Sequence, residues 1–281
     1  MRSGLLTRST RHLCASSIRP RAYSPAMSFA VAADAYDRFM GRYSQPLART
    51  FADLIGISAE WRVLDVGCGP GALLTELLGR LNESSVVGVD PSASFVDAAR
   101  ARHPGIEVYH ASAEELPLTD DSFDCALAQL VVHFMADPIV GLREMGRVTR
   151  PGGVVGACVW DFEEGGGPLS TFWTAAKELD PQAPGEANLP GTRRGQLVKL
   201  LDEAGLDHVE GTTLGVDVVH PSFEDWWKPF ELGVGPAGGY VSSLGVLDRN
   251  RLRERCREIL PEAPFTVSAV AWAACGVVPA R

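Results

Sequence analysis

Long hydrophobic runs are missing from this sequence. None reaches the ~18 consecutive apolar residues that a membrane-spanning helix needs, and the longest, residues 265–279, has the length and Val/Ala content of a strand. Cysteine is also scarce, with six residues of which no two have the spacing of metal ligands or of a disulfide framework. We therefore expect no membrane span, no metal site and free thiols.

Basic residues are in deficit. The chain has 26 Lys and Arg against 35 Asp and Glu, which gives a formal net charge of −9. A protein that binds nucleic acid through a general basic surface has the opposite balance. The composition therefore argues against a nucleic-acid partner, and it leaves the oligomeric state undetermined. A small molecule is the expected partner because of the length of the expected substrate-side segment at 223–244.

Acidic residues are absent from residues 1–33, which contain five arginines and several serines. This composition is typical of an organelle transit peptide, and the run from Arg21 to Ser24 is similar to a mitochondrial processing site. We expect residues 1–26 to be a leader and the protein to be mitochondrial. The alternative is a cytoplasmic protein that starts at Met27.

Short apolar runs alternate with runs of helical period from residue 61 onward. This rhythm predicts a parallel sheet with helices on both faces. We expect a helical N-terminal lid at 27–60 and one domain at 61–281, with core motifs at 63–160 and substrate-side insertions at 161–190 and 221–247. The Gly-rich run at 233–239 predicts a mobile or tight loop. The expected strands are 63–66, 86–90, 106–109, one within 123–132, 154–160, 209–219 and 265–278, and the expected helices are 72–81, 92–103, 138–148, 195–206 and 248–260.

A glycine turn follows the first expected strand and carries Gly67, Gly69 and Gly71. Glycines here let the backbone turn tightly and approach a ligand, while the next helix points its free N–H groups at it. With Asp90 at the end of the second strand, the spacing also satisfies a dinucleotide fingerprint. Asp65 argues against a dinucleotide, because its carboxylate would repel a pyrophosphate and attract an ammonium group. The alternative for Asp65 is a carboxylate that accepts hydrogen bonds from the loop's own amides.

The stretch Val-Leu-Asp-Val-Gly-Cys-Gly-Pro-Gly at 63–71 resembles the first motif of class I S-adenosylmethionine (SAM)-dependent methyltransferases. The resemblance continues, in the right order, through the blocks at 88–90, 113–118, 121–124 and 147–153. The set is similar to the small-molecule "type 11" branch, which includes quinone C-methyltransferases, and residues 36–44 resemble the leader segment of some members. The resemblance implies a Rossmann-like, doubly wound α/β fold with a seven-stranded sheet whose last strand is antiparallel.

The resemblance also implies roles for particular residues. Asp65 and the glycine loop would hold the methionine part of SAM, and Asp90 would hold the ribose. Ser112 stands where family members often carry Asp, which predicts less charge assistance to the adenine amine. The remaining expected cofactor contacts are Pro91 or Ser92 beside the adenine, Ala113 at the adenine edge and Gln129 near the methionine end.

Methyl transfer needs mainly the alignment of nucleophile, methyl carbon and sulfur. A base helps when the nucleophile carries a proton, and His133, just after the fourth strand, is the candidate; a core histidine bonded to backbone is the alternative. Trp160 and Asp161, at the end of the fifth expected strand, are further candidates at the same rim. The remaining histidines, His103, His110, His208 and His220, are interpreted as helix-end or surface residues. The expected substrate residues are Tyr36, Trp160, Trp226 and Trp227, with ordinary packing as the alternative.

Three functions are consistent with these residues. The preferred one is transfer of a methyl group from SAM to a small molecule, with no metal. A methyltransferase-like protein without catalysis, acting in assembly or regulation, is the second. A nicotinamide-linked oxidoreductase is the third, because of the dinucleotide spacing.

Overall fold

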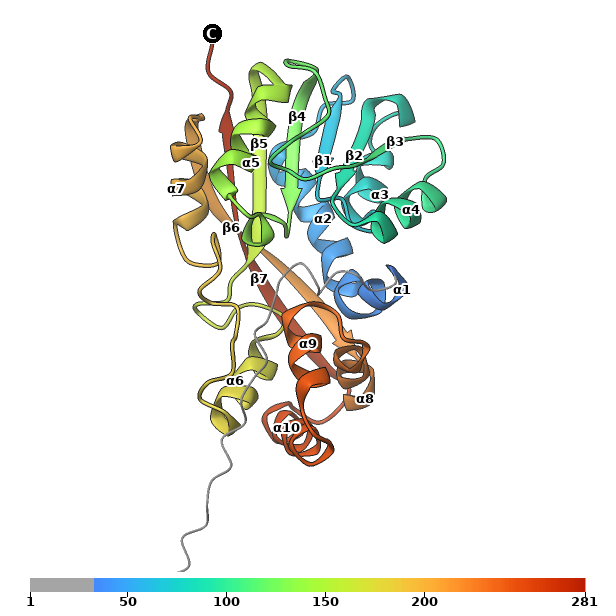
Figure 1. The fold of residues 1–281 in the computed structure, drawn as a ribbon, viewed down its shortest axis with the longest axis vertical. Helices are drawn as coiled ribbons and strands as arrows, with labels where there is room; N and C mark the ends of the chain where they lie inside the picture. Colours follow the sequence, from blue (N-terminus) through green and yellow to red (C-terminus); the bar gives the residue numbers. More distant parts are fainter. Residues whose placement is uncertain (1–32, 281) are drawn as a thin grey trace, which may run out of the picture.

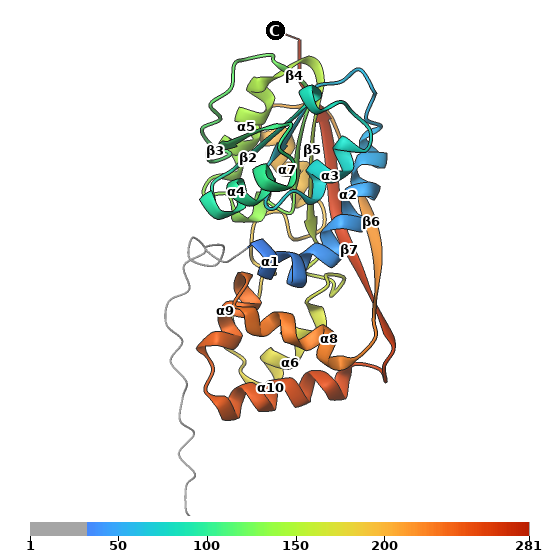
Figure 2. The same cartoon turned by 90° about the vertical axis from the view of Figure 1, so that its right-hand side faces the viewer.

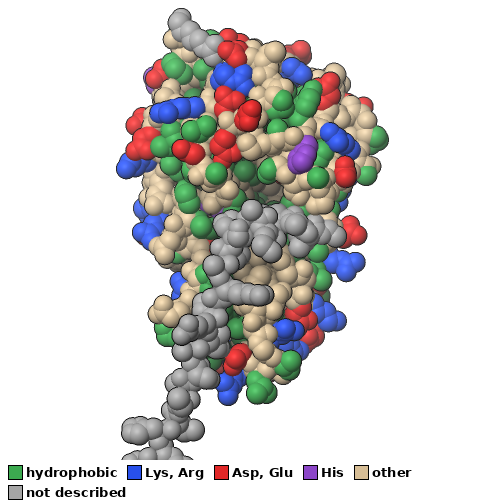
Figure 3. All heavy atoms as spheres, viewed as in Figure 1, with side chains coloured by type: hydrophobic (Ala, Val, Ile, Leu, Met, Phe, Trp, Pro, Cys, Tyr) green, Lys and Arg blue, Asp and Glu red, His purple; other side chains and the backbone are tan. Residues whose placement is uncertain are grey.

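A computed structural model describes residues 33–280. The expected leader at 1–26 and the first part of the expected lid, 27–32, lie outside the described residues. Within 33–280, every helix is too short or too polar to cross a bilayer. On the face shown in Figure 3, acidic and basic side chains are interspersed over the surface.

A single seven-stranded sheet forms the centre of the molecule, with the strand order β3-β2-β1-β4-β5-β7-β6. The first five strands are parallel, and β7 runs antiparallel to both of its neighbours. The predicted α/β fold with an antiparallel last strand is therefore confirmed. The strands are β1 (Val63–Val66), β2 (Val86–Asp90), β3 (Glu107–His110), β4 (Phe123–Gln129), β5 (Thr149–Trp160), β6 (Asp207–His220) and β7 (Phe265–Val277).

Helices cover both faces of this sheet (Figure 1). One core packs α2 (Arg42–Ile55), α3 (Ala72–Leu78) and α4 (Ala93–Arg102) against one face, and a second core packs α5 (Pro138–Val148) and α7 (Gln196–Glu203) against the other. Adjacent residues Val63 and Leu64 belong to different cores, because successive strand side chains point to opposite faces. The sheet order reverses between β1 and β4, and ligands of such sheets bind at the carboxyl ends of the strands near this point.

Strands β6 and β7 extend beyond the end of β5. The β5–β7 pairing stops at Trp160 opposite Ala271, whereas the β6–β7 pairing continues to His220 opposite Phe265. Beyond the end of β5 lies a group of helices that we call the helical cap: α6 (Ser170–Leu179), α8 (Phe223–Trp227), the 3₁₀ segment η5 (Lys228–Leu232), α9 (Gly235–Ser243) and α10 (Val246–Ile259). Figures 1 and 2 show these helices gathered beyond the carboxyl ends of the parallel strands.

The prediction of a loop at 233–239 was wrong, because α9 begins at Gly235. A Cβ atom at Gly238 would lie 2.7 Å from the backbone of Gly233. Glycine therefore permits a close backbone approach here, which lets a Gly-rich run form a packed helix.

The N-terminal segment crosses between the sheet and the helical cap (Figure 2). It consists of α1 (Ala33–Tyr36), the π-helical turn η2 (Asp37–Gly41) and α2. Arg102 of α4 ties it down by an ion pair with Asp37 and a 2.7 Å hydrogen bond from Arg102 to the carbonyl of Pro70 in the glycine loop. The expected helical lid is therefore joined directly to the predicted ligand loop.

Candidate active site

The glycine loop between β1 and α3 has the conformation that its sequence demands. Gly67, Gly69 and Gly71 all have positive φ, at 69°, 54° and 102°. A Cβ atom at Gly67 would lie 2.4 Å from the side chain of Val131, so only glycine fits there. The loop is thus pressed against the segment that follows β4.

A cavity with about 300 Å³ of open space lies beside this loop, and we call it the glycine-loop cavity. Its walls come from the N-terminal segment, β1, the loop, α3 and the end of β4. The residues that line it are Tyr36, Ser44, Asp65, Gly67, Cys68, Gly69, Pro70, Ala72, Leu73, Gln129 and Leu130.

Two acceptor atoms in these walls have no hydrogen-bond partner. Asp65 is 1% exposed and Gln129 is 8% exposed, and the Oδ2 atom of Asp65 and the Oε1 atom of Gln129 are buried and unpaired. The Gln129 amide is oriented by its Nε2 atom, which donates a 3.0 Å hydrogen bond to the carbonyl of Ser44. Burial, and then the nearby charge of Asp90, raise the pKa of Asp65 well above its ordinary value, against a hydrogen bond from the Leu74 backbone.

These unpaired acceptors fit a cationic, hydrogen-bond-donating group. Buried acceptors without partners cost free energy, and an ammonium group would satisfy both while offsetting the charge of Asp65. The alternative in which the loop amides satisfy Asp65 fails for Oδ2. The residues therefore fit the amino-acid end of SAM, as the motif implied.

Asp90 lies at the end of β2 and is 5% exposed. Its Oδ2 atom accepts a 2.8 Å hydrogen bond from the Gly69 N–H, and its Oδ1 atom accepts one of 2.8 Å from the Ser92 N–H. Burial raises its pKa, and the two amide hydrogen bonds oppose that rise. The two amides fix the carboxylate at the carboxyl end of β2, where a ribose would need its acceptor.

The expected adenine side is built from the turns after β2 and β3. Pro91 is exposed and Ser92 and Ser112 are half-buried, whereas Ala113 is 7% exposed and packs into the core on the α5 face. An adenine contact at Ala113 would therefore involve its backbone rather than its methyl group. The carbonyl of Pro91 also lies 2.9 Å from Nε2 of His110, which braces the first turn against β3.

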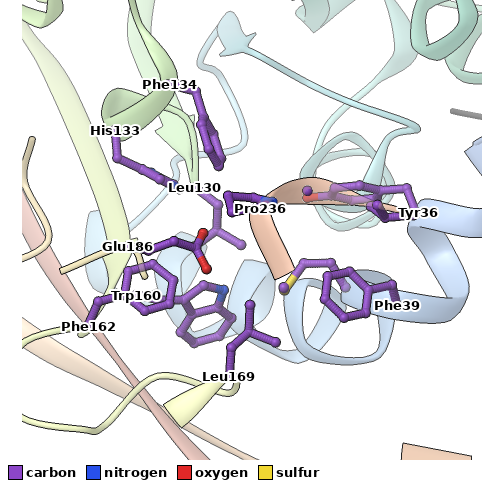
Figure 4. Close-up of a pocket in the computed structure, with 13 residues that line it drawn as sticks. Tyr36, Phe39, Leu130, His133, Phe134, Trp160, Phe162, Leu169, Glu186 and Pro236 are labelled. Atoms are coloured by element: carbon purple, nitrogen blue, oxygen red, sulfur yellow. The ribbon is translucent and has the colours of Figure 1, made fainter. Parts of the chain in front are cut away.

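A second cavity, with about 390 Å³ of open space, lies between the sheet and the helical cap (Figure 4). We call it the apolar cavity, because most of its walls are hydrophobic: Phe39, Met40, Phe134, Phe162, Leu169, Val234 and Pro236. Tyr36 and Leu130 line both cavities, so the two are neighbours. Leu130 has a φ of 62°, which is rare for a non-glycine residue and marks a strained turn between the cavities.

His133 and Trp160 lie in the wall of the apolar cavity, as expected from their places after β4 and at the end of β5. His133 is 5% exposed with Nδ1 unpaired, and Trp160 is 2% exposed with Nε1 unpaired. Burial lowers the pKa of His133 to about 3. The imidazole is therefore neutral near pH 7, and it is a weak base compared with the near-neutral pKa that suits general-base catalysis.

Glu186 is the residue of this cavity that the sequence did not reveal. It lies in the Gly- and Pro-rich connection between α6 and α7, is 4% exposed, and accepts a 2.8 Å hydrogen bond from Trp173 Nε1. Burial raises its pKa to about 7. No periodicity or motif in that connection singles out this carboxyl group, because only the fold brings it to the cavity.

Trp226 and Trp227 do not line the apolar cavity, but Trp226 lines a smaller pocket that shares Phe39 and Leu169 with it. Both are almost fully buried, at 2% and 1% exposed, in an aromatic cluster with Phe223 and Phe230. This burial agrees with their alternative interpretation, ordinary packing, and their substrate role stays a prediction. Tyr36 and Trp160 do line that cavity.

His220 was wrongly interpreted as a surface or helix-end residue. It is 1% exposed at the end of β6, with Nε2 2.8 Å from the Tyr43 hydroxyl and Nδ1 3.0 Å from the Asp225 carboxylate. Asp225 also forms a 2.6 Å ion pair with Arg42 of α2. This cluster ties the N-terminal segment to the helical cap, and its buried position arises because β6 continues past the rest of the sheet.

No group of His, Cys, Asp and Glu side chains within residues 33–280 is arranged to hold a metal ion. Asp161, the other candidate at this rim, has a structural role. Its Oδ1 atom accepts hydrogen bonds from the backbone N–H groups of Glu163 and Glu164. It therefore shapes the turn that leads from β5 toward the cap.

Comparison with known proteins finds a methyltransferase match in the part of the chain that carries β1, β2, β3 and β4. Residues 64–156 match a family model described as a methyltransferase domain. An uncharacterized methyltransferase of Mycobacterium bovis is 40% identical over 139 residues, covering 50% of this chain and 54% of the relative. A ubiquinone/menaquinone biosynthesis C-methyltransferase of Geobacter is 36% identical over 108 residues, covering 36% of this chain and 46% of the relative. The chain thus spans about half the length of the curated relatives it matches.

A solved structure shares the fold over most of the described chain. Phosphoethanolamine N-methyltransferase 2 of Haemonchus contortus, in complex with phosphomonomethylethanolamine and S-adenosylhomocysteine, superposes with a TM-score of 0.55 at 18% identity, covering 88% of this chain and 57% of that chain. The two proteins therefore share the same seven-stranded, Rossmann-like fold. Residues 64–156 thus match a methyltransferase domain, and the described chain has the fold of a solved methyltransferase.

Proposed function

We propose that the protein transfers the methyl group of SAM to a small, largely apolar acceptor bound in the apolar cavity. One observation carries this proposal: the glycine-loop cavity, with its unpaired acceptors at Asp65 and Gln129, adjoins the apolar cavity through the shared residues Tyr36 and Leu130. A donor held in the first cavity and an acceptor held in the second would be neighbours. Such an arrangement supports catalysis by proximity and orientation.

When bound, SAM supplies an electrophilic methyl group on a sulfonium. The protein's part is to hold and align: Asp65 and Gln129 would accept hydrogen bonds from the ammonium group, and Asp90 would accept hydrogen bonds from the ribose hydroxyls. The aromatic and aliphatic walls around Tyr36, Leu130 and Phe134 keep water away from the junction. Tyr36 packs edge-to-face on Phe95 with ring centroids 5.3 Å apart, which fixes its ring over the α4 side of the site.

The apolar walls favour an acceptor with a hydrophobic ring or chain. A quinone-type or quinol-type molecule is consistent with these walls and with the activity named for the Geobacter relative. We therefore extend the proposal to an acceptor of this size and polarity.

The test is ligand binding followed by turnover. Calorimetry with SAM, S-adenosylhomocysteine and NADH should show binding of the first two and none of the third. An extract of small molecules incubated with methyl-labelled SAM should yield a labelled product of low mass. Binding of SAM without any labelled product would favour the assembly or regulatory alternative, and preferential binding of NADH would overturn the proposal.

We further propose a mitochondrial location, because residues 1–33 are rich in Arg and free of acids. A fluorescent protein fused behind these residues should be imported into mitochondria. The matched control replaces the five arginines of the segment with glutamine and should stay in the cytosol, and equal distribution of both fusions would contradict the proposal.

A further inference from the structure

Three buried polar groups interrupt the otherwise hydrophobic walls of the apolar cavity: the Glu186 carboxyl group, the Trp160 indole N–H and the His133 imidazole. They come from three separate parts of the chain, namely the α6–α7 connection, the end of β5 and the turn after β4. In Figure 4, the Glu186 carboxyl group and the Trp160 indole nitrogen lie on the same side of the cavity and are turned toward its interior. Their hydrogen-bonding properties determine which polar groups a bound acceptor molecule must carry.

The Glu186 side chain is held in place from behind. Trp173 of α6 donates its indole N–H to the Oε2 atom at 2.8 Å, and Gly185, with a φ of 61°, makes the turn that presents Glu186 to the cavity. Burial raises the pKa of this carboxyl group to about 7, and the hydrogen bond from Trp173 limits the rise. The group therefore takes up and releases a proton near neutral pH.

The Trp160 indole provides a hydrogen-bond donor, whereas the ionised Glu186 carboxylate provides an acceptor. Its Nε1 atom is buried and has no partner, although a buried indole N–H normally finds an acceptor. An indole N–H only donates. It therefore requires a ligand atom with a lone pair, such as a hydroxyl or phenolate oxygen, and it offers nothing to an ammonium group.

A hydroxyl group meets both requirements at once, because its oxygen accepts from Trp160 and its proton is donated to Glu186. A protonated amine would satisfy the carboxylate but leave the indole N–H unpaired, at the cost of a buried orphan donor. A hydrocarbon without polar atoms would leave both groups unpaired. The two groups together therefore select for a hydroxylated acceptor.

We propose that the acceptor is an apolar ring compound bearing a hydroxyl group, which Trp160 Nε1 and Glu186 hold and whose proton Glu186 accepts. This inference rests on the proposed function. A bond forms between the acceptor oxygen and the methyl carbon, the carbon–sulfur bond breaks with its electron pair going to sulfur, and the hydroxyl proton moves to the carboxylate. Glu186 rather than His133 is then the base.

The charged and titratable groups around Glu186 leave it available for this role. Tyr36 of the N-terminal segment and His133 share the apolar cavity with it. Glu163 and Lys177 share an adjoining cavity on the far side of Glu186, toward α6. Among these described neighbours, Trp173 is the hydrogen-bond partner of the carboxyl group, and no ion pair of Glu186 is found.

The first test measures recognition without turnover. Binding of 2-naphthol and of 2-methylnaphthalene, which replaces the hydroxyl with a methyl group, is measured by calorimetry on protein saturated with S-adenosylhomocysteine. The wild type should bind 2-naphthol at least about tenfold more tightly than its isostere, since a lost hydrogen bond to a charged group costs about that much. Trp160→Phe and Glu186→Gln should each reduce this preference, and Glu163→Gln, on the solvent side, should retain it.

The second test is the pH profile of methyl transfer to 2-naphthol. In the wild type, kcat should fall as the pH drops below about 7, because Glu186 becomes protonated. Glu186→Gln should lower kcat by roughly 10²–10⁴-fold and abolish this acidic limb, while the binding of S-adenosylhomocysteine stays within about twofold. His133→Ala should keep the acidic limb.

The outcomes separate this inference from the proposed function. Retention of the 2-naphthol preference in both Trp160→Phe and Glu186→Gln, or of the acidic limb in Glu186→Gln, overturns the inference while leaving a methyltransferase. Loss of the limb in His133→Ala alone would transfer the base role to His133. Failure of the wild type to bind S-adenosylhomocysteine overturns the proposed function instead.

Discussion

The side chains of Asp65 and Gln129 face one cavity from neighbouring strands, β1 and β4, and each leaves one buried oxygen without a hydrogen-bond donor. Such unpaired atoms destabilise the ligand-free protein and become favourable only when a donor arrives. These two residues thus favour ligand binding while they lower the stability of the ligand-free protein.

Replacing Asp65 by Asn should separate these two effects. Asp65→Asn removes the buried negative charge, so SAM affinity should fall by about 10–100-fold, as expected for a lost charge-assisted hydrogen bond. The free energy of unfolding without ligand should rise by about 1 kcal/mol, because the desolvated carboxylate is gone. Calorimetry and urea denaturation measure the two quantities, and Asp202→Asn, an exposed change on α7, is the control. A loss of stability together with a loss of binding would contradict the assignment.

Asp90 should respond differently, because its carboxylate already accepts from the Gly69 and Ser92 amides. Asp90→Ala should weaken SAM binding by about 1.5–3 kcal/mol. It should also lower stability, since two backbone N–H groups lose their acceptor. Asp90→Asn keeps one acceptor oxygen and should recover part of the stability but little of the affinity. Unchanged SAM affinity in both variants would remove Asp90 from the ribose site.

Gly67 and Gly152 are a matched pair of positions at which to measure how much an added side chain at positive φ destabilises the fold. Both have φ near 70°, but a Cβ atom at Gly67 would meet Val131 at 2.4 Å, whereas nothing lies within 4 Å of one at Gly152. Gly152→Ala should cost about 1–2 kcal/mol through backbone strain alone. Gly67→Ala should cost a further 1–3 kcal/mol through overpacking and should weaken SAM binding. Equal losses in urea denaturation would show that the loop moves freely away from Val131.

Glu186 should make stability depend on pH in a particular direction. Because its pKa is raised from 4.5 in the unfolded chain to about 7 in the folded protein, the folded state holds the proton more tightly. Its contribution is fully present below about pH 4.5, falls as the pH rises, and is lost above about 7. Glu186→Gln should therefore be more stable than the wild type at pH 8 by on the order of 3 kcal/mol, with the difference vanishing toward pH 4.5. Thermal unfolding across this pH range is the measurement. A stability difference that does not change with pH would contradict a raised pKa for the buried Glu186 carboxyl group.

The parts of the fold that follow local rules could be predicted from the sequence. The expected helix at 138–148 matches α5, since Asp137 caps it by accepting from the Ile139 and Val140 amides and Pro138 occupies its first turn. The glycine loop, Asp65 and Asp90 were found because their roles depend on short spacing along the chain. Their geometry in the structure agrees with that expectation.

The parts that depend on distant contacts could not be predicted. His220 is buried only because β6 outruns β5 and meets Tyr43 from the N-terminal segment, 177 positions away. Glu186 reaches the apolar cavity from a connection without periodicity, and Trp173 buries it there. The Gly-rich run at 233–239 forms a helix because of close backbone packing, which composition alone does not reveal.

The way the helical cap is attached has a consequence for how such proteins diversify. The cap grows from the connections after β5 and β6, whereas the residues expected to hold the methyl donor sit on β1, β2, β4 and the loop between β1 and α3. Insertions, deletions or exchanges within the cap would therefore change the part of the apolar cavity that the cap lines, at Val234 and Pro236, while the donor side keeps its sequence. Proteins built on this plan can accommodate new acceptors by changes in these two connections, without changes in β1, β2 and the glycine loop, where the donor is expected to bind.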